Sequence, residues 1–71
     1  MVLDAVFIGN NIRNLRKSAN KSQESFAEQI DTTPRTVSNI ENGVVLPSLQ
    51  TIANISECFN LSIDSIIRKE E

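Results

Sequence analysis

Histidine, tryptophan and tyrosine are absent from this sequence, and cysteine occurs once, at Cys58. Histidine is the usual general base of enzymes, and clusters of histidine and cysteine hold most structural zinc. One cysteine also excludes a disulfide bond within the chain. We therefore expect no enzymatic activity, no metal, no cofactor and no small-molecule substrate.

Long apolar runs are missing as well. The segment MVLDAVFIG has no basic part and contains Asp4, so it does not resemble a secretory signal, and no apolar stretch approaches membrane-spanning length. The expected location is cytoplasmic, with no membrane partner. Seven basic against nine acidic residues give a formal net charge of -2, which by itself argues mildly against a nucleic-acid partner.

At 71 residues the sequence is the length of one domain, so residues 1–71 are expected to fold as a unit. Apolar residues at helical spacing predict a first helix over residues 5–19. Its inner stripe is Ile8, Ile12, Leu15 and Ala19.

Residues 22–43, SQESFAEQIDTTPRTVSNIENG, are punctuated as two short helices joined by a tight turn. Ser22 and Thr33 are expected N-caps, and Pro34 occupies a first helical position, where its missing N–H costs nothing. Gly43 is expected to end the second helix with a positive φ.

The second of these helices, residues 34–42, has one apolar and one polar side. Val37 and Ile40 are expected to face inward. The opposite, polar side carries Arg35, Ser38 and Asn39, with Pro34 at its tip.

Residues 48–67 predict two more helices, and no segment has a strand pattern, so the predicted class is all-α with five helices. Three turns contain an Asn or Asp that tolerates the left-handed conformation: Asn20, Asp31 and Asn60. Ser48 is the expected cap of a helix with the inner stripe Leu49, Ile52, Ile55 and Phe59, and Ser62 the cap of a short helix with Ile63, Ile66 and Ile67.

Between residues 7 and 67 an ordered series of motifs is present: IG at 8–9, IR at 12–13, LRK at 15–17, SQ at 22–23, FA at 26–27, TVS at 36–38, IENG at 40–43, PSL at 47–49, and LS at 61–62 followed by Asp64. This series resembles the Cro/CI-type (XRE-like) helix-turn-helix family of lambdoid phage repressors and small bacterial regulators. The resemblance implies a compact lambda-repressor-like DNA-binding domain of bacterial or phage origin.

The resemblance implies that the helix over residues 34–42 lies in the major groove and reads bases. Arg35 can form two hydrogen bonds with guanine and Asn39 two with adenine, whereas Ser38 can pair with several bases. Pro34 departs from the polar residue often found there and offers only apolar contact. Without the resemblance, this face could equally be a solvated polar surface.

The resemblance also implies phosphate contacts on both sides of this helix. Gln23 would hold a phosphate with its amide and the N–H groups at the start of its helix, although an ordinary solvated glutamine is the alternative. Asn42 and the backbone around Gly43 would form the second clamp. The expected phosphate-binding residues are Gln23, Thr33, Thr36, Asn42, Gly43 and Val44.

Glu41 lies one turn from Val37, on the inner side of its helix, where an unpaired carboxylate would be costly. The resemblance implies an ion pair between Arg16 and Glu41. This pair would fix the base-reading helix against the first helix without contacting DNA.

Residues 44–46, Val-Val-Leu, depart from the polar or basic loop of comparable domains. We expect them to pack against another apolar surface. The following helix is the first choice, a second copy of the chain the second, and a different protein the third. Small regulators of this kind bind two half-sites as twofold dimers. The expected dimer contacts are Val45, Leu46, Ile63 and Ile66, unless the two isoleucines complete the monomer core.

The sequence leads to two functional hypotheses, which belong to different classes of protein. The first is a sequence-specific regulator of transcription that binds double-stranded DNA, namely a repressor that occupies a palindromic operator as a homodimer. Repression is the expected sign of regulation, because no separate effector, ligand-sensing or activation domain is recognisable in the sequence. The alternative is a protein-interaction module on the same scaffold, an antirepressor or antitoxin-like partner with weak or no DNA binding.

Overall fold

The computed structural model describes residues 2–68, and this part of the chain folds into five α-helices without a strand. The predicted all-α class is confirmed. The helices are α1 (Ala5–Ser18), α2 (Gln23–Gln29), α3 (Pro34–Glu41), α4 (Leu49–Phe59) and α5 (Ile63–Ile67).

Each helix begins with a side chain that accepts a hydrogen bond from the backbone N–H three residues further on. Such a cap satisfies one of the N–H groups that the first helical turn leaves unpaired. The four caps expected from the sequence are present, and Asp4 provides a fifth for α1. The turn residues Asn20, Asp31 and Asn60 have φ angles of 56°, 60° and 55°, as expected, and Gly43 has a φ of 72°.

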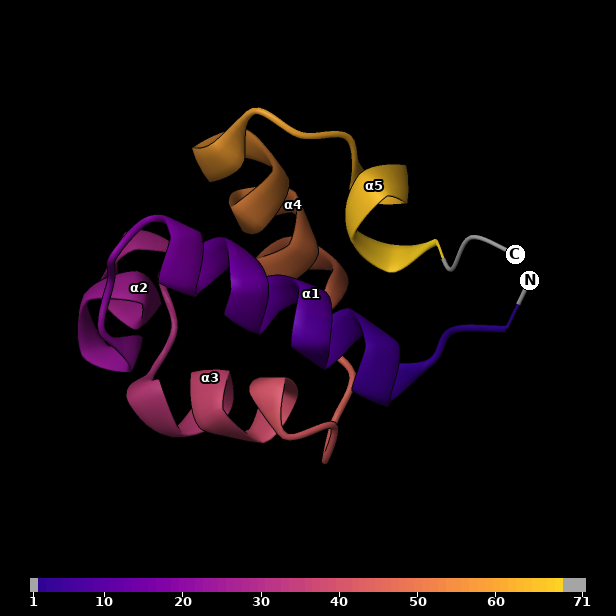
Figure 1. The fold of residues 1–71 in the computed structure, drawn as a ribbon, viewed down its shortest axis with the longest axis horizontal. Helices are drawn as coiled ribbons and strands as arrows, with labels where there is room; N and C mark the ends of the chain where they lie inside the picture. The colour runs from indigo at the N-terminus through magenta and orange to yellow at the C-terminus, as the bar shows by residue number, and fades with distance from the viewer. Residues whose placement is uncertain (1, 69–71) are drawn as a thin grey trace.

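Helix α1 lies between α3 on one side and α5 on the other (Figure 1). The core is formed by ten apolar side chains from all five helices and the C-terminal cap of α2. Phe26 packs against Phe59 with ring centroids 6.0 Å apart. The core residues are Ile8, Ile12, Phe26, Ala27, Ile30, Val37, Ile40, Ile52, Ile55 and Ile66.

Two residues predicted to face the core do not. Leu49 is 77% exposed, because it is the first residue of α4 and lies one turn before Ile52, the first buried residue of that helix. Ala19 is exposed because α1 ends at Ser18 and the chain turns there. In both cases the apolar spacing extends past the end of the packed part of the helix.

Helices α1 and α3 cross so closely at Gly9 that no side chain fits there. A Cβ atom at Gly9 would lie 2.1 Å from the carbonyl oxygen of Ile40. Gly9 is buried in α1, and Ile40 lies near the end of α3. This glycine therefore sets the distance between α3 and its support.

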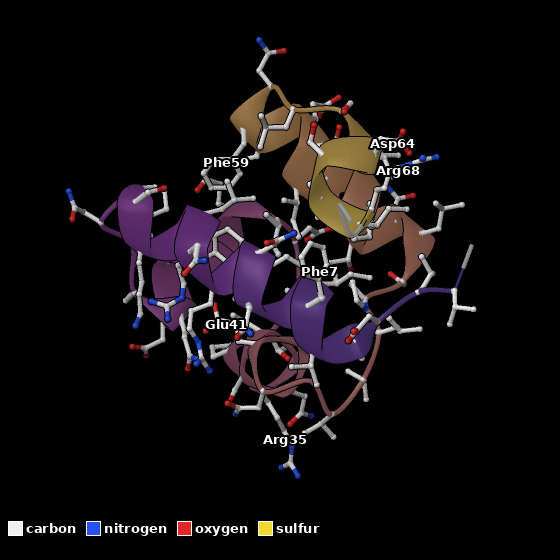
Figure 2. All side chains as sticks on the ribbon, turned by 45° about the vertical axis from the view of Figure 1, so that its right-hand side comes forward. Phe7, Arg35, Glu41, Phe59, Asp64 and Arg68 are labelled. Carbon is white, nitrogen blue, oxygen red and sulfur yellow. The ribbon has the colours of Figure 1, made fainter. Side chains whose placement is uncertain are left out.

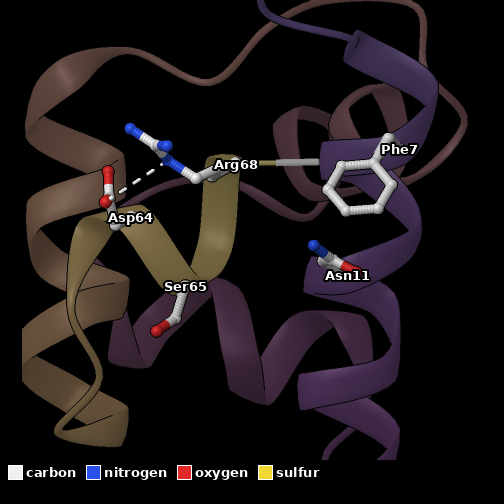
Figure 3. Close-up of a pocket in the computed structure, with 5 residues that line it drawn as sticks. All are labelled: Phe7, Asn11, Asp64, Ser65 and Arg68. Atoms are coloured by element: carbon white, nitrogen blue, oxygen red, sulfur yellow. Dashed lines mark ion pairs between the residues drawn. The ribbon is translucent and has the colours of Figure 1, made fainter. Parts of the chain in front are cut away.

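Helix α5 is attached to the other side of α1. Asn11 Nδ2 donates to the carbonyl oxygen of Ile66 at 3.0 Å, and Ile66 has 1% of its surface exposed. The expectation that Ile66 contributes to a dimer is corrected, because its side chain fills the monomer core. Beside this contact, a cavity of about 490 Å³ is lined by Phe7, Asn11, Asp64, Ser65 and Arg68 (Figure 3).

No helix in residues 2–68 has the length and apolar character needed to cross a membrane.

Candidate nucleic-acid interface

The polar side of α3 faces solvent and its apolar side is buried. Val37 and Ile40 are each 1% exposed, whereas Pro34 and Arg35 are exposed, and Figure 2 shows Arg35 projecting away from the rest of the protein. Ser38 and Asn39 are half-buried on the same helix. The residues expected to read bases thus form one accessible surface.

At the start of α3, the two threonines form a hydrogen-bonded cap. Thr33 Oγ1 accepts from the N–H of Thr36 at 3.1 Å and donates to Thr36 Oγ1 at 2.9 Å. The hydroxyl hydrogen of Thr33 is therefore used within the cap. The hydroxyl hydrogen of Thr36 is left to donate to a group outside the protein.

The end of α3 is closed by a Schellman motif, in which two backbone N–H groups donate back to the last turn of the helix. Gly43 N donates to the oxygen of Ile40 at 3.0 Å, and Val44 N donates to that of Asn39 at 2.9 Å. Of the expected phosphate clamp, the N–H groups of Gly43 and Val44 are already hydrogen-bonded within the protein, and the contact of the Asn42 side chain with phosphate stays a prediction.

The expected ion pair between α1 and α3 is present. Arg16 Nε lies 2.6 Å from Glu41 Oε2, and Arg16 Nη2 lies 3.0 Å from Oε1, while the side chain of Glu41 is fully buried. A third nitrogen of Arg16 donates to the carbonyl oxygen of Lys21 at 2.9 Å. The guanidinium thus joins α1, the turn after it and α3.

Gln23 also contributes to this ion-pair cluster. Its Nε2 donates to Glu41 Oε1 at 3.1 Å, so the first residue of α2 is attached to the end of α3. The sequence had predicted for Gln23 a phosphate contact or an ordinary solvated side chain, and not this hydrogen bond. One amide hydrogen serves the buried carboxylate, and the second N–H is left for a ligand.

Two opposing effects set the pKa of Glu41. Burial by itself would raise it, but the hydrogen bonds from Arg16 and Gln23 and the positive charge of Arg16 outweigh burial and lower the pKa below its ordinary value. The hydrogen bond that Arg16 donates to this carboxylate correspondingly raises the pKa of Arg16. Glu41 is therefore held in its charged form.

Arg13 is a further member of the interface that sequence analysis missed. Its Nη2 donates to Asn42 Oδ1 at 2.8 Å, and its Nε lies 3.5 Å from Glu41 Oε1. The available signal was its spacing of three residues from Arg16, which places both arginines on one side of α1. Only the crossing of α1 and α3 reveals that Asn42 lies within its reach.

The loop after α3 is apolar and exposed. Val44, Val45 and Leu46 are 68%, 41% and 46% exposed. The first-ranked expectation, that they pack against the following helix, is wrong, because the loop leaves the Schellman motif on the surface and Leu49 also faces solvent. This surface lies next to the polar face of α3 along the chain.

The matching family supports the same arrangement. A sequence profile described as helix-turn-helix matches residues 12–66, more than half of the chain. The chain belongs to this family, in its Cro/CI-type (XRE-like) branch. The resemblance inferred from the sequence is confirmed.

Several curated proteins are similar to this helix-turn-helix chain. It is 32% identical over 60 residues to the transcriptional activator BcrR of Enterococcus faecalis, covering 84% of this chain and 29% of BcrR. It is 32% identical over 62 residues to the transcriptional regulator YgzD of Bacillus subtilis, and the match covers 87% of this chain and 94% of YgzD. It is 29% identical over 59 residues to RstR, a transcriptional repressor of a cryptic phage in Vibrio cholerae, and the match covers 83% of this chain and 53% of RstR.

Solved structures share the fold at lower identity. The P22 c2 repressor, in complex with a synthetic operator, superimposes with a TM-score of 0.83 at 19% identity, covering 90% of this chain and 97% of the repressor. The restriction-modification controller protein C.AhdI of Aeromonas hydrophila superimposes with a TM-score of 0.80 at 25% identity, and the match covers 89% of this chain and 96% of C.AhdI. The predicted five-helix lambda-repressor-like architecture is thereby confirmed.

Proposed function

We propose that this protein is a sequence-specific regulator of transcription that binds double-stranded DNA with α3 in the major groove. The observation that carries the proposal is the orientation of α3. Arg35 and its polar neighbours face solvent, while Val37 and Ile40 are buried in the core and Glu41 pairs with Arg16 of α1. A major groove admits an α-helix presented in this way.

Base contacts are assigned to the outward side chains of α3. Arg35 is long, exposed and suited to guanine, and Asn39 is suited to adenine. Ser38 and Pro34 add a hydroxyl and an apolar contact. These residues lie together on one helix face, as reading of adjacent base pairs requires.

Phosphate contacts are assigned to three side chains with uncommitted donors around α3. They are the second amide N–H of Gln23, the hydroxyl of Thr36 and the amide N–H of Asn42 that is not bonded to Ser38. Thr33, Gly43 and Val44 are assigned to the helix caps instead, because their donor groups are used there. Phosphate contacts orient α3 without adding sequence preference.

The proposed active form is a homodimer on a palindromic operator in the bacterial cytoplasm. Val45 and Leu46 supply exposed apolar surface for a twofold contact, and half-buried Ile63 is the remaining candidate on α5. Repression is the proposed sign of regulation, because a bound dimer blocks a promoter without any further surface. The similar proteins include both an activator and a repressor.

Selection of duplexes from a random pool by the purified protein tests this function. We expect one enriched palindromic sequence, and binding that weakens steeply as salt rises, because each neutralised phosphate releases counterions. Recovery of no preferred sequence, with no salt dependence, would contradict the proposal.

The exposed apolar loop favours one second function, a protein-interaction module. Val44, Val45 and Leu46 together with Leu49 could contact another protein, and the net charge of -2 does not favour DNA. In that case the chain would bind its partner with little salt dependence and would enrich no duplex. The same selection, at two salt concentrations, separates the two functions.

A further inference from the structure

Three polar side chains form a chain of hydrogen bonds that ends on the base-reading face. Arg13 Nη2 donates to Asn42 Oδ1 at 2.8 Å, and Asn42 Nδ2 donates to Ser38 Oγ at 3.4 Å. Arg13 belongs to α1, Asn42 caps the end of α3, and Ser38 lies one turn earlier on α3. The chain therefore runs from the supporting helix to the surface proposed to face DNA.

The direction of these hydrogen bonds is fixed at Arg13. A guanidinium has five N–H donors and no acceptor, so Asn42 must turn its oxygen toward Arg13. The amide nitrogen then faces Ser38. Rotation of the amide by half a turn would place its N–H groups against those of Arg13 and break the 2.8 Å hydrogen bond.

Arg13 is itself held in place by the buried carboxylate of Glu41. Its Nε lies 3.5 Å from Glu41 Oε1, and 34% of its side chain is exposed. A guanidinium attracted at Nε and hydrogen-bonded at Nη2 keeps a defined orientation, because its atoms are coplanar. Arg16 supplies the principal ion pair to the same carboxylate, so removal of Arg13 leaves that ion pair intact.

Ser38 has an uncommitted hydrogen. Its Oγ accepts from Asn42, and within residues 2–68 it donates to no protein group. A hydroxyl has one donor and two acceptor positions, and the amide of Asn42 occupies one acceptor position. The hydrogen is thus free to turn toward a base.

We propose that Arg13 is a positioning residue that sets Ser38 as a hydrogen-bond donor, so that Ser38 selects a base presenting an acceptor atom. Those atoms are purine N7, guanine O6 and thymine O4, as opposed to the amino groups of adenine and cytosine. If the amide of Asn42 were turned the other way, its oxygen would take the hydroxyl hydrogen of Ser38, and Ser38 could then only accept. The inference rests on the proposed function and adds to it the chemical polarity of one base contact.

The test uses the operator recovered from the random pool and base analogues that lack single atoms. The base pair that Ser38 reads is the one at which Ser38→Ala relaxes the preference. At that pair, one duplex lacks the acceptor, through a 7-deazapurine or a thymine analogue without O4. A second duplex lacks the exocyclic amine, through purine in place of adenine or 2-pyrimidinone in place of cytosine.

Wild-type protein is expected to bind the acceptor-deleted duplex about fivefold more weakly than the parent, as for one hydrogen bond. Its affinity for the amine-deleted duplex should equal that for the parent. We call this fivefold loss of affinity the acceptor penalty. Arg13→Met, which keeps the apolar stem and loses the guanidinium, should reduce the acceptor penalty to below about twofold. Arg13→Lys, which still only donates, should restore it.

Lys17→Met is the matched control, since Lys17 is an exposed basic residue one turn further along α1. It removes the same charge as Arg13→Met and should keep the full acceptor penalty, so any general loss of phosphate attraction is subtracted. Thermal unfolding of each variant confirms that it is folded. A purely electrostatic role of Arg13 would weaken the parent and both analogue duplexes alike.

The inference is overturned if the penalty follows deletion of the amine, if Arg13→Met keeps the fivefold sensitivity, or if Ser38→Ala relaxes no base pair. In those cases the wild-type protein still selects an operator, so the proposed function stands. If the wild-type protein selects no duplex, the proposed function fails and the inference with it.

Discussion

Glu41 shows how a single buried charge can position a functional helix. Its carboxylate is fully buried, and it is stable there because Arg16 and Gln23 donate to it from α1 and α2. Removing one partner of such a pair leaves the other charge buried and unpaired, which is more costly than never having the pair. The residue therefore determines where α3 lies although it faces away from the surface proposed to contact DNA.

Acidification should weaken this cluster. The folded-state pKa of Glu41 is below its ordinary value of 4.5, so the stabilisation is present above that pH and is lost as the pH falls below it. At about pH 6 we expect Glu41→Gln to lower the free energy of unfolding by roughly 3 kcal/mol. The deficit should shrink as the pH falls below 4.5 toward the lowered pKa of wild-type Glu41, because its carboxylate then takes up a proton.

Urea unfolding at a series of pH values measures this difference. Glu57→Gln, at an exposed glutamate of α4, controls for the removal of one negative charge. A deficit for Glu41→Gln that stays constant across the acid range would show that its charge does not stabilise the fold.

Arg35 is a second single residue with a predicted role, and in contrast to the buried Glu41 its side chain is exposed to solvent. Because it is exposed and proposed to contact guanine, Arg35→Ala should cost about 1–3 kcal/mol of binding and relax the preference at one base pair. Gln23→Ala should instead weaken binding to all duplexes alike. Arg68→Ala is the charge-matched control, since Arg68 is also exposed and lies on the opposite side of the protein from Arg35 in Figure 2. Equal losses on every sequence for Arg35→Ala would remove it from the base readers.

At the scale of elements, α3 is supported by its crossing with α1 and closed by caps at both ends. The caps were predictable, because Thr33, Pro34 and Gly43 carry local preferences that need no tertiary context. The crossing at Gly9 was not, since its Cβ position is blocked by the carbonyl oxygen of Ile40, a residue far along the chain. Sequence reveals helix ends better than the distance between helices.

Gly9→Ala should therefore destabilise the protein, although alanine is normally the better helix former by about 0.5–1 kcal/mol. The added methyl group would lie 2.1 Å from backbone, so α3 must shift, at a cost of about 1–3 kcal/mol or more. Asn10→Ala, at the exposed neighbouring position, should leave stability unchanged or slightly raised. Chemical denaturation compares the two variants, and equal stability would show that the crossing has room to adjust.

At the scale of the whole molecule, α1 lies between α3, whose outer face is proposed to read bases, and α5 (Figure 1). The order of helices and most of the core followed from apolar periodicity. Ile66 and Leu49 were misplaced, because periodicity identifies an apolar face without showing whether a partner covers it. The link from Arg13 to Asn42 was missed for a related reason: it joins two helices whose crossing no local pattern encodes.

The proposed dimer gives a prediction at this scale. Replacing both Val45 and Leu46 by serine should weaken self-association by about tenfold or more, since exposed apolar surface would otherwise be buried between protomers. Monomer stability should change less than association, because the two side chains are already 41% and 46% exposed in the monomer. Sedimentation equilibrium measures the association, and Val2→Ser, at a 92% exposed valine, is the control. Unchanged association of the double variant would place the dimer contact elsewhere.

The side chains that attach α3 and those proposed to contact bases belong to different sets. Val37, Ile40 and Glu41 hold the helix, whereas Arg35 contributes nothing to that attachment. Operator preference can therefore diverge during evolution without a compensating repair of the core. For the same reason, transplanting the outward residues of a relative onto this scaffold should transfer that relative's target sequence while leaving the melting behaviour of the recipient intact.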